Sequence, residues 1–284
     1  MDIYIFCQLH YQFYCRRNNM KLSVLQFNPI HKNVQKNYEL IENYLLSLKD
    51  SIVVLPELAT TGYLFESREE IIDLAEEVPN GPFTKLLENI AKKNNLVIVS
   101  GVAERDGEKV FNSSLLVSNS GFIGKYRKIN LFYKEKNVFE EGEKLEVFDV
   151  NFMNQSLRIG MMICFDWFFP EISRKLKLMG AQIIAHPSNL VLPYCPKAMP
   201  IRALENKLYT ITANRIGIEK NQNETLKFIG QSVICSPKAE YLLKLNENDE
   251  GIFSIETDII INENITKYNN LSQDLKKLYE KLDF

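Results

Sequence analysis

The chain has 284 residues, 45% of them hydrophobic and 25% charged, which is typical of a globular protein that needs no disulfide or metal to hold its core. Its 34 basic and 36 acidic residues give a net charge of −2, so no basic excess points to nucleic acid or an anionic membrane. No apolar run reaches the roughly 18 residues of a membrane-spanning helix, so we expect neither nucleic acid nor membrane as a partner.

Residues 1–19 are predicted to be an uncertain N-terminal extension. The segment MDIYIFCQLHYQFYCRRNN is rich in aromatic residues, but polar residues interrupt any apolar core of a signal peptide. Met20 then opens a clear first strand. We interpret 1–19 as a poorly ordered or mis-assigned extension, with a functional arm as the alternative.

Short apolar runs rich in β-branched residues recur along the chain and predict strands. Several are apolar on both faces, as expected for sheets that are covered on each side. A Gly-containing turn follows the run 110–118 and predicts a hairpin with 122–127. The strand predictions cover 22–27, 51–56, 96–104, 110–118, 157–164, 181–187, 208–214, 231–237 and 251–257.

Helical patterns lie between these runs, at 33–50, 81–95, 170–180 and 196–208. Their apolar residues recur at helical spacing, and Pro and Gly stand near the expected starts and ends. Alternation of strands and helices, together with hairpins, indicates an α/β protein with mixed sheets. Residues 271–282 predict a last helix in a tail over 259–284, which is a candidate association element.

Three reactive side chains each follow an apolar strand. They are Glu57 in VVLPELATTGY, Lys128 in FIGKYRKINLFYKE and Cys164 in RIGMMICFDWFFPEISR. In α/β proteins, functional groups collect at the carboxyl ends of strands. Taken singly, each has a structural alternative, because Glu57 suits an ion pair, Lys128 a solvated position and Cys164 a packed core.

Taken together, the three side chains complement one another chemically. A thiol must lose its proton to attack, a carboxylate in a partly dry pocket can accept that proton, and a fixed ammonium stabilises the negative charge that develops. Among the three histidines, only His186 is a credible rival base. His10 lies in the extension and His31 in a loop. A Cys164–His186 dyad is therefore an alternative.

The five cysteines show no regular spacing and no CxxC pair, so no metal site is predicted. Free thiols in a reducing, cytoplasmic setting are expected. Cys195 and Cys235 are interpreted as inert packing residues or incidental surface thiols.

At the level of motifs, the chain resembles the nitrilase, or carbon–nitrogen hydrolase, superfamily from Met20 to about Asp258. LPELATTGY, KYRKINLF and ICFDWFFPE carry the family's Glu-Lys-Cys trio in the family's order. HPSNL, RALENKLY, TANRIG and GQSVICSPKAE match as well. YRKINLFYKEKNVFEEG is similar to members that act on small aliphatic substrates, and Glu135 matches the family's second glutamate.

The resemblance implies a four-layer αββα sandwich over residues 20–258, at least a homodimer, and no cofactor or metal. It implies that Glu57 is the base and Cys164 the nucleophile. Lys128 and the backbone N–H of Phe165 would stabilise the tetrahedral stage, while Glu135 positions Lys128 and the substrate. Asp166 is expected to tie the loop after the nucleophile.

The resemblance leaves the substrate open. The candidates for lining the pocket are Tyr63, Tyr133, Trp167 and Asn189, which suit a small neutral aliphatic group. The favoured reaction converts a small aliphatic amide or nitrile to the acid and ammonia. An ω-amidase or an N-carbamoyl-amine amidohydrolase is the alternative within the class. A non-catalytic binding member and an acyltransferase are more remote.

Overall fold

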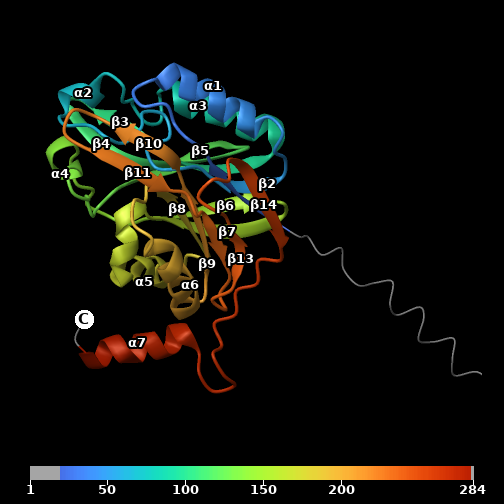
Figure 1. The fold of residues 1–284 in the computed structure, drawn as a ribbon. Coiled ribbons are helices and arrows are strands. Elements are labelled where there is room, and N and C mark those ends of the chain that lie inside the picture. The colour runs from blue at the N-terminus through green and yellow to red at the C-terminus, as the bar shows by residue number, and fades with distance from the viewer. Residues whose placement is uncertain (1–19, 283–284) are drawn as a thin grey trace, which may run out of the picture.

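The computed structural model describes residues 20–282 and contains two six-stranded sheets packed face to face (Figure 1). The strands of the first sheet are β1 (Met20–Gln26), β2 (Ser51–Val54), β3 (Leu96–Asp106), β4 (Lys109–Ser118), β5 (Gly121–Arg127) and β14 (Gly251–Thr257). They lie in the order β14-β1-β2-β3-β4-β5. The pairs β1–β2 and β2–β3 are parallel and the rest antiparallel, so the sheet is mixed, as predicted.

The second sheet repeats this plan with a parallel centre and antiparallel edges. Its strands are β6 (Val147–Phe152), β7 (Gln155–Met161), β8 (Ile183–Ser188), β9 (Tyr209–Asn214), β12 (Val233–Cys235) and β13 (Tyr241–Lys244). They lie in the order β13-β12-β9-β8-β7-β6. A separate hairpin, β10 (Ile216–Lys220) and β11 (Thr225–Ile229), reaches toward the first sheet.

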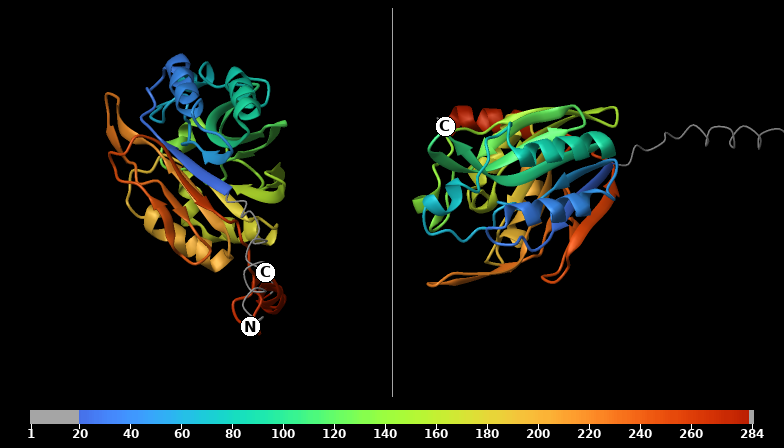
Figure 2. Two further views of the ribbon diagram at one scale, coloured as in Figure 1. Left: turned by 90° about the vertical axis from the view of Figure 1, so that its right-hand side faces the viewer. Right: turned by 90° about the horizontal axis from the view of Figure 1, so that it is seen from above.

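Helices cover the outer face of each sheet (Figure 2). The first sheet carries α1 (Val34–Leu45) and α3 (Pro82–Asn94), and the second carries α5 (Pro170–Leu178) and α6 (Cys195–Asn206). The predicted αββα sandwich is therefore confirmed. The shorter helices are α2 (Glu69–Ile72), α4 (Glu135–Val138) and the 3-10 helix η1 (Cys164–Phe168).

The alternation of side chains along the strands divides the core into layers. Leu22 and Val24 of β1 face the second sheet, whereas Leu25 belongs to the cluster that packs under α1 and α3. Both faces of this strand are therefore dry, which is why its sequence is apolar almost throughout.

The C-terminal tail leaves the sandwich after β14. An ion pair of 2.8 Å between Lys177 of α5 and Glu263 holds its start. Helix α7 (Leu271–Leu282) has the predicted bounds and lies apart from the two sheets in Figure 1. Across residues 20–282, no helix is both long enough and apolar enough to cross a membrane. The predicted extension 1–19 lies outside the described residues.

All nine predicted strands are present, and the predicted hairpin is β4–β5. The prediction missed β6, β10, β11 and β13, which are short and partly exposed and therefore lack a continuous apolar run. The predicted helix 33–50 ends at Leu45, and the predicted strand 157–164 ends at Met161. Because this strand ends at Met161, Cys164 lies beyond the sheet.

The topology brings the ends of β2 and β5 to the same edge of the first sheet. Strands β2 and β5 point the same way because β3 is parallel to β2 and β4 reverses the chain before β5. The segment after β2 then crosses β3 closely. The Gly101 N–H donates to the Pro56 carbonyl at 3.1 Å, and the Ala59 N–H donates to the Gly101 carbonyl at 3.2 Å.

Replacing Gly101 with alanine should destabilise this crossing. An added Cβ would lie 2.4 Å from the Glu57 Cα and 2.7 Å from the Leu58 nitrogen, both backbone atoms that cannot rotate away. We expect Gly101→Ala to lower the free energy of unfolding by about 1–3 kcal/mol, measured by urea denaturation. Gly160→Ala is the matched control, because its Cβ would meet only the Leu176 side chain. Equal losses in both variants would contradict this view of the crossing.

Candidate active site

Glu57 lies in the turn after β2 and is fully buried. Its Oε1 accepts hydrogen bonds from Lys128 Nζ and Asn112 Nδ2, each at 2.7 Å. Its Oε2 has no partner within residues 20–282. Burial raises the pKa of Glu57, and the charge of Lys128 only partly opposes this. The free oxygen thus belongs to a carboxylate that accepts a proton more readily than an exposed one.

Lys128 owes its burial to strand alternation. Lys125 and Arg127 turn outward to Glu104, whereas Tyr126 and Lys128 turn inward, and Lys128 is fully buried. Burial lowers the pKa of the ammonium, but the charges of Glu135 and Glu57 outweigh it and raise the pKa above the ordinary value. Lys128 therefore stays protonated.

Glu135, the first residue of α4, holds Lys128 from the other side. It is buried, and its Oε1 accepts from Lys128 Nζ at 2.8 Å while its Oε2 accepts from the Phe132 N–H at 3.0 Å. An ammonium has three N–H donors. The carboxylates of Glu57 and Glu135 take two of them within the described chain, so one donor is left for a ligand.

Cys164 begins η1, three residues after Met161, the last residue of β7. Its φ of +40° lies in the left-handed region, which a residue with a Cβ rarely adopts. The side chain is buried except for 5% of its surface, which faces a cavity. A strained turn that presents a thiol to a cavity is unusual for a mere packing residue.

The thiol of Cys164 is surrounded by charge. Burial raises its pKa well above the ordinary value, and Glu57 adds to the rise. The charge of Lys128 and a hydrogen bond from the backbone N–H of Asn189 oppose it. The thiol is therefore protonated near neutral pH and needs a base before it can attack.

Asp166 fixes the turn after Cys164, as predicted. Its carboxylate accepts from the Ile163 N–H at 2.9 Å, the Tyr126 hydroxyl at 2.8 Å and Asn130 Nδ2 at 2.9 Å. Because Tyr126 belongs to β5, these bonds join the strand that carries Lys128 to the turn that carries Cys164. The two reactive groups are thus held in one framework across the two sheets.

His186 contacts the main chain of Cys164. Its Nε2 lies 3.0 Å from the Cys164 carbonyl oxygen, and its Nδ1 lies 3.0 Å from the Thr212 hydroxyl. Since a carbonyl can only accept, Nε2 carries the hydrogen, and Nδ1 accepts from Thr212. Burial lowers the pKa of His186 to about 4. This neutral ring positions the Cys164 backbone, which does not support the alternative Cys-His dyad.

A cavity of about 180 Å³ opens beside Cys164. It offers about the volume of six water molecules in the liquid. Asn189 and Trp167, two of the candidates for lining the pocket, are among its walls, and no charged side chain is. Its walls are Phe132, Cys164, Phe165, Trp167, Phe168, Asn189, Leu190, Val191, Leu192 and Tyr194.

Tyr63 and Tyr133, the other two candidates for lining the pocket, are not among the walls of this cavity. Both line a smaller hollow beside Glu135 and Glu224. Burial and the charge of Glu135 raise the pKa of Tyr63 well above its ordinary value, and its hydroxyl donates to Glu135. Tyr133 is 60% exposed. Tyr63 therefore supports Glu135, and it lies close enough to the triad for Glu57 and Cys164 to raise its pKa as well.

The contacts that support Tyr63 come from the β10–β11 hairpin. Glu219 on β10 accepts from the Tyr63 N–H at 3.0 Å and from the Leu64 N–H at 2.8 Å, and it pairs with the fully buried Arg215. The ring of Phe228 on β11 packs edge-on against Tyr63 at 5.9 Å. TANRIG was recognised as a motif, but the hairpin that follows it was not predicted, so these contacts had no visible signal.

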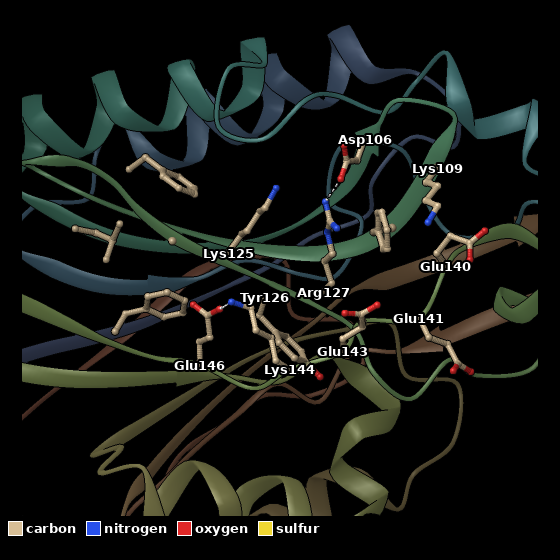
Figure 3. A pocket seen from close by; sticks show the side chains of 16 residues that line it. Asp106, Lys109, Lys125, Tyr126, Arg127, Glu140, Glu141, Glu143, Lys144 and Glu146 are labelled. Atoms are coloured by element: carbon tan, nitrogen blue, oxygen red, sulfur yellow. Dashed lines mark hydrogen bonds and ion pairs between the residues drawn. The ribbon is translucent and has the colours of Figure 1, made fainter.

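A second hollow, of about 570 Å³, lies along β5 and is lined by many charged side chains (Figure 3). Lys125 and Arg127 there pair with Glu104, and Arg127 also pairs with Asp106. It contains none of Glu57, Lys128 and Cys164.

In residues 20–282, no group of three or more His, Cys, Asp or Glu side chains could hold a metal ion. The buried trio beside the 180 Å³ cavity is therefore the candidate active site.

The chain is similar to known proteins both in sequence and in fold. The profile of the carbon–nitrogen hydrolase family matches residues 21–260. A nitrilase of Pyrococcus abyssi is 47% identical over 92% of this chain and 98% of its own length. A probable nitrilase of Schizosaccharomyces pombe is 30% identical over 84% and 88%. The crystal structure of an amidase from Nesterenkonia sp. shares the fold, with a TM-score of 0.76, 22% identity and coverage of 95% and 98%.

The geometry predicts selective alkylation of Cys164. In a variant with Cys7 and Cys15 replaced by serine, iodoacetamide should label Cys164 well before Cys195 and Cys235, because Cys164 faces the 180 Å³ cavity whereas the other two are fully buried. Peptide mass spectrometry over time measures the three rates. Similar rates at all three thiols would contradict the prediction, and Cys164→Ala provides the blank.

Removal of the buried ammonium should cost stability in a pH-dependent way. Lys128→Met leaves Glu57 beside Glu135 without a cation, so the pKa of Glu57 rises further in the folded state. A raised folded-state pKa makes stability fall as pH rises. We expect a loss of about 3–5 kcal/mol at pH 7.5 and clearly less at pH 5, measured by urea denaturation.

The matched control for that experiment is Lys125→Met on the same strand. Lys125 is partly exposed, and its partner Glu104 keeps Arg127, so we expect a loss of less than about 1 kcal/mol at either pH. An Lys128→Met loss that is equal at both pH values would contradict the electrostatic account.

Proposed function

The chain belongs to the carbon–nitrogen hydrolase family and is a hydrolase of carbon–nitrogen bonds, and on this premise we propose that Glu57, Lys128 and Cys164 are its catalytic triad. The proposed reaction converts a small neutral aliphatic amide or nitrile to a carboxylic acid and ammonia. The observation that carries the proposal is the 2.7 Å bond between Lys128 and Glu57 beside a thiol whose pKa responds to both charges.

The first step is proton transfer from Cys164 to Glu57. The thiol is protonated in its buried setting, and Glu57 has one carboxylate oxygen without a partner in the described chain. As the proton moves to Glu57, the sulfur attacks the substrate carbon and forms the carbon–sulfur bond.

The negative charge then moves to the substrate oxygen of an amide or the nitrogen of a nitrile. The remaining N–H of Lys128 and the backbone N–H of Phe165 stabilise it in the proposed site. Glu135 keeps Lys128 oriented, and Tyr63 and Glu219 in turn support Glu135. These groups are held before substrate arrives, so little reorganisation accompanies the charge transfer.

For an amide, protonated Glu57 gives its proton to the departing nitrogen, and ammonia leaves a thioester on Cys164. For a nitrile, the thioimidate first adds one water and then loses ammonia to reach the same thioester. A water molecule, deprotonated by Glu57, next attacks the thioester. The acid departs and the thiol is restored.

The cavity favours a neutral substrate. An ω-amide of a dicarboxylic acid brings a carboxylate and an N-carbamoyl diamine brings an ammonium, yet no charged side chain lines the 180 Å³ cavity to pair with either. Burying an unpaired charge costs several kcal/mol. Short neutral amides and nitriles therefore fit better than the substrates of the two alternative activities.

We also propose that residues 20–258 form the hydrolase domain and that the chain works as a homodimer in a reducing, cytoplasmic setting. The tail 259–284 is the proposed association element. Exposed Ile265, Tyr268 and Leu278 on it support this role. Three free cysteines among the described residues support the reducing setting.

The experiment that tests the function is a screen for ammonia release. The panel holds short aliphatic nitriles, mono- and diamides and N-carbamoyl amines, with no added amine acceptor. We expect turnover of neutral amides or nitriles, none in Cys164→Ala, and a loss of about 10³-fold in Glu57→Gln. His186→Asn should be much milder, because the ring contacts only the Cys164 main chain among the groups of the triad.

Three outcomes would overturn the proposal. Ammonia release by folded Cys164→Ala would show that Cys164 is not the nucleophile. Ligand binding without turnover of any compound would favour a non-catalytic member. Turnover that requires an amine acceptor would favour acyl transfer.

A further inference from the structure

One polar side chain in the active-site cavity is left without a partner. Asn189 is 3% exposed, and neither its Oδ1 nor its Nδ2 has a hydrogen-bond partner within residues 20–282. It lines the cavity with Cys164. Buried side-chain amides in native proteins are almost always hydrogen-bonded, and an unpaired one costs about 1–3 kcal/mol. The free amide therefore indicates a missing partner in the cavity.

The neighbouring groups do not supply that partner. The remaining walls beside Asn189 are largely aromatic and aliphatic, and the adjacent Leu190 N–H is already bonded to Asn214 Oδ1 at 2.7 Å. Water can occupy such a site in the free protein. A substrate that displaces this water must replace its hydrogen bonds or lose affinity.

The backbone places Asn189 next to the reacting atoms. Its N–H donates to the Cys164 sulfur, so the side chain leaves the adjacent Cα and enters the cavity beside the thiol. The reacting oxygen or nitrogen already has the Lys128 donor in the proposed mechanism. Asn189 thus faces the part of the substrate that adjoins the scissile carbon.

The chemistry of the side chain restricts what it can bind. A carboxamide is neutral and offers both a donor and an acceptor. No charged side chain lines the cavity, so an ionised group would stay unpaired there. The ligand group that complements Asn189 is therefore a neutral polar group other than the one that reacts. Because the cavity has only 180 Å³, this group lies a few bonds from the reacting amide or nitrile.

We propose that Asn189 determines specificity by binding a second amide or nitrile of a short bifunctional substrate. This inference rests on the hydrolase function proposed above and names its substrate class. Short diamides, dinitriles and cyanoamides should be preferred over monofunctional compounds of the same size.

The test compares substrates that match in heavy-atom count. The pairs are succinonitrile with valeronitrile and succinamide with hexanamide. In the unmodified protein, kcat/KM should be about 10-fold higher or more for the bifunctional member. Asn189→Leu, which keeps the branched shape and the number of side-chain heavy atoms, should abolish or reverse the preference, mainly through KM. Val191→Ala is the matched control, and it should weaken both members of a pair equally.

Two results would overturn the inference. One is an absence of preference for the bifunctional members. The other is an Asn189→Leu loss that is equal within each pair, which would place Asn189 on the scissile group or in a purely structural role.

A binding measurement separates this inference from the proposed function. Calorimetry on Cys164→Ala gives Kd for succinamide and hexanamide without turnover. Tighter binding of succinamide that disappears in Cys164→Ala/Asn189→Leu supports the inference even if the ammonia screen fails. Equal binding of the two compounds counts against the inference even if the screen succeeds.

Discussion

The structure depends on one buried ammonium between two buried carboxylates. Lys128 contacts Glu57 at 2.7 Å and Glu135 at 2.8 Å, and its side chain is closed to solvent. Removing these charges from water costs several kcal/mol for each ion, and only close pairing and additional hydrogen bonds recover it. The surrounding residues meet that requirement. Asn112 donates a hydrogen bond to Glu57, and the Phe132 N–H and the Tyr63 hydroxyl donate to Glu135.

Elements from both halves of the sandwich hold this arrangement. Asp166 joins β5 to the turn of Cys164, and Glu219 on the β10–β11 hairpin holds the backbone of Tyr63. The ends of β2, β5 and β7 define where the three reactive residues leave the sheets. Strand ends alone do not set the orientation of side chains, and these tertiary hydrogen bonds supply it. A site spread over 108 positions of sequence is thereby made rigid.

Much of the fold was predictable, because apolar runs and helical periods report burial directly. The location of Glu57, Lys128 and Cys164 after strands was visible for the same reason. The burial of Lys128 was not, since KYRK reads as a solvated segment until β5 is paired and its inner face is known. The sequence also could not show that Tyr63 and Tyr133 line the hollow beside Glu135 and not the cavity beside Cys164. Their positions depend on a hairpin whose strands are short and half exposed, and local sequence carries little information about such strands.

The site contains two carboxylates and a single ammonium, so with both acids ionised it carries one surplus negative charge. For the proposed reaction this imbalance acts on the product. A neutral amide or nitrile enters without electrostatic penalty, but the acid that forms ionises beside Glu57 and is repelled. Departure of the product is then favoured and its return is opposed. The surplus negative charge of the resting site would thus weaken inhibition by the acid product.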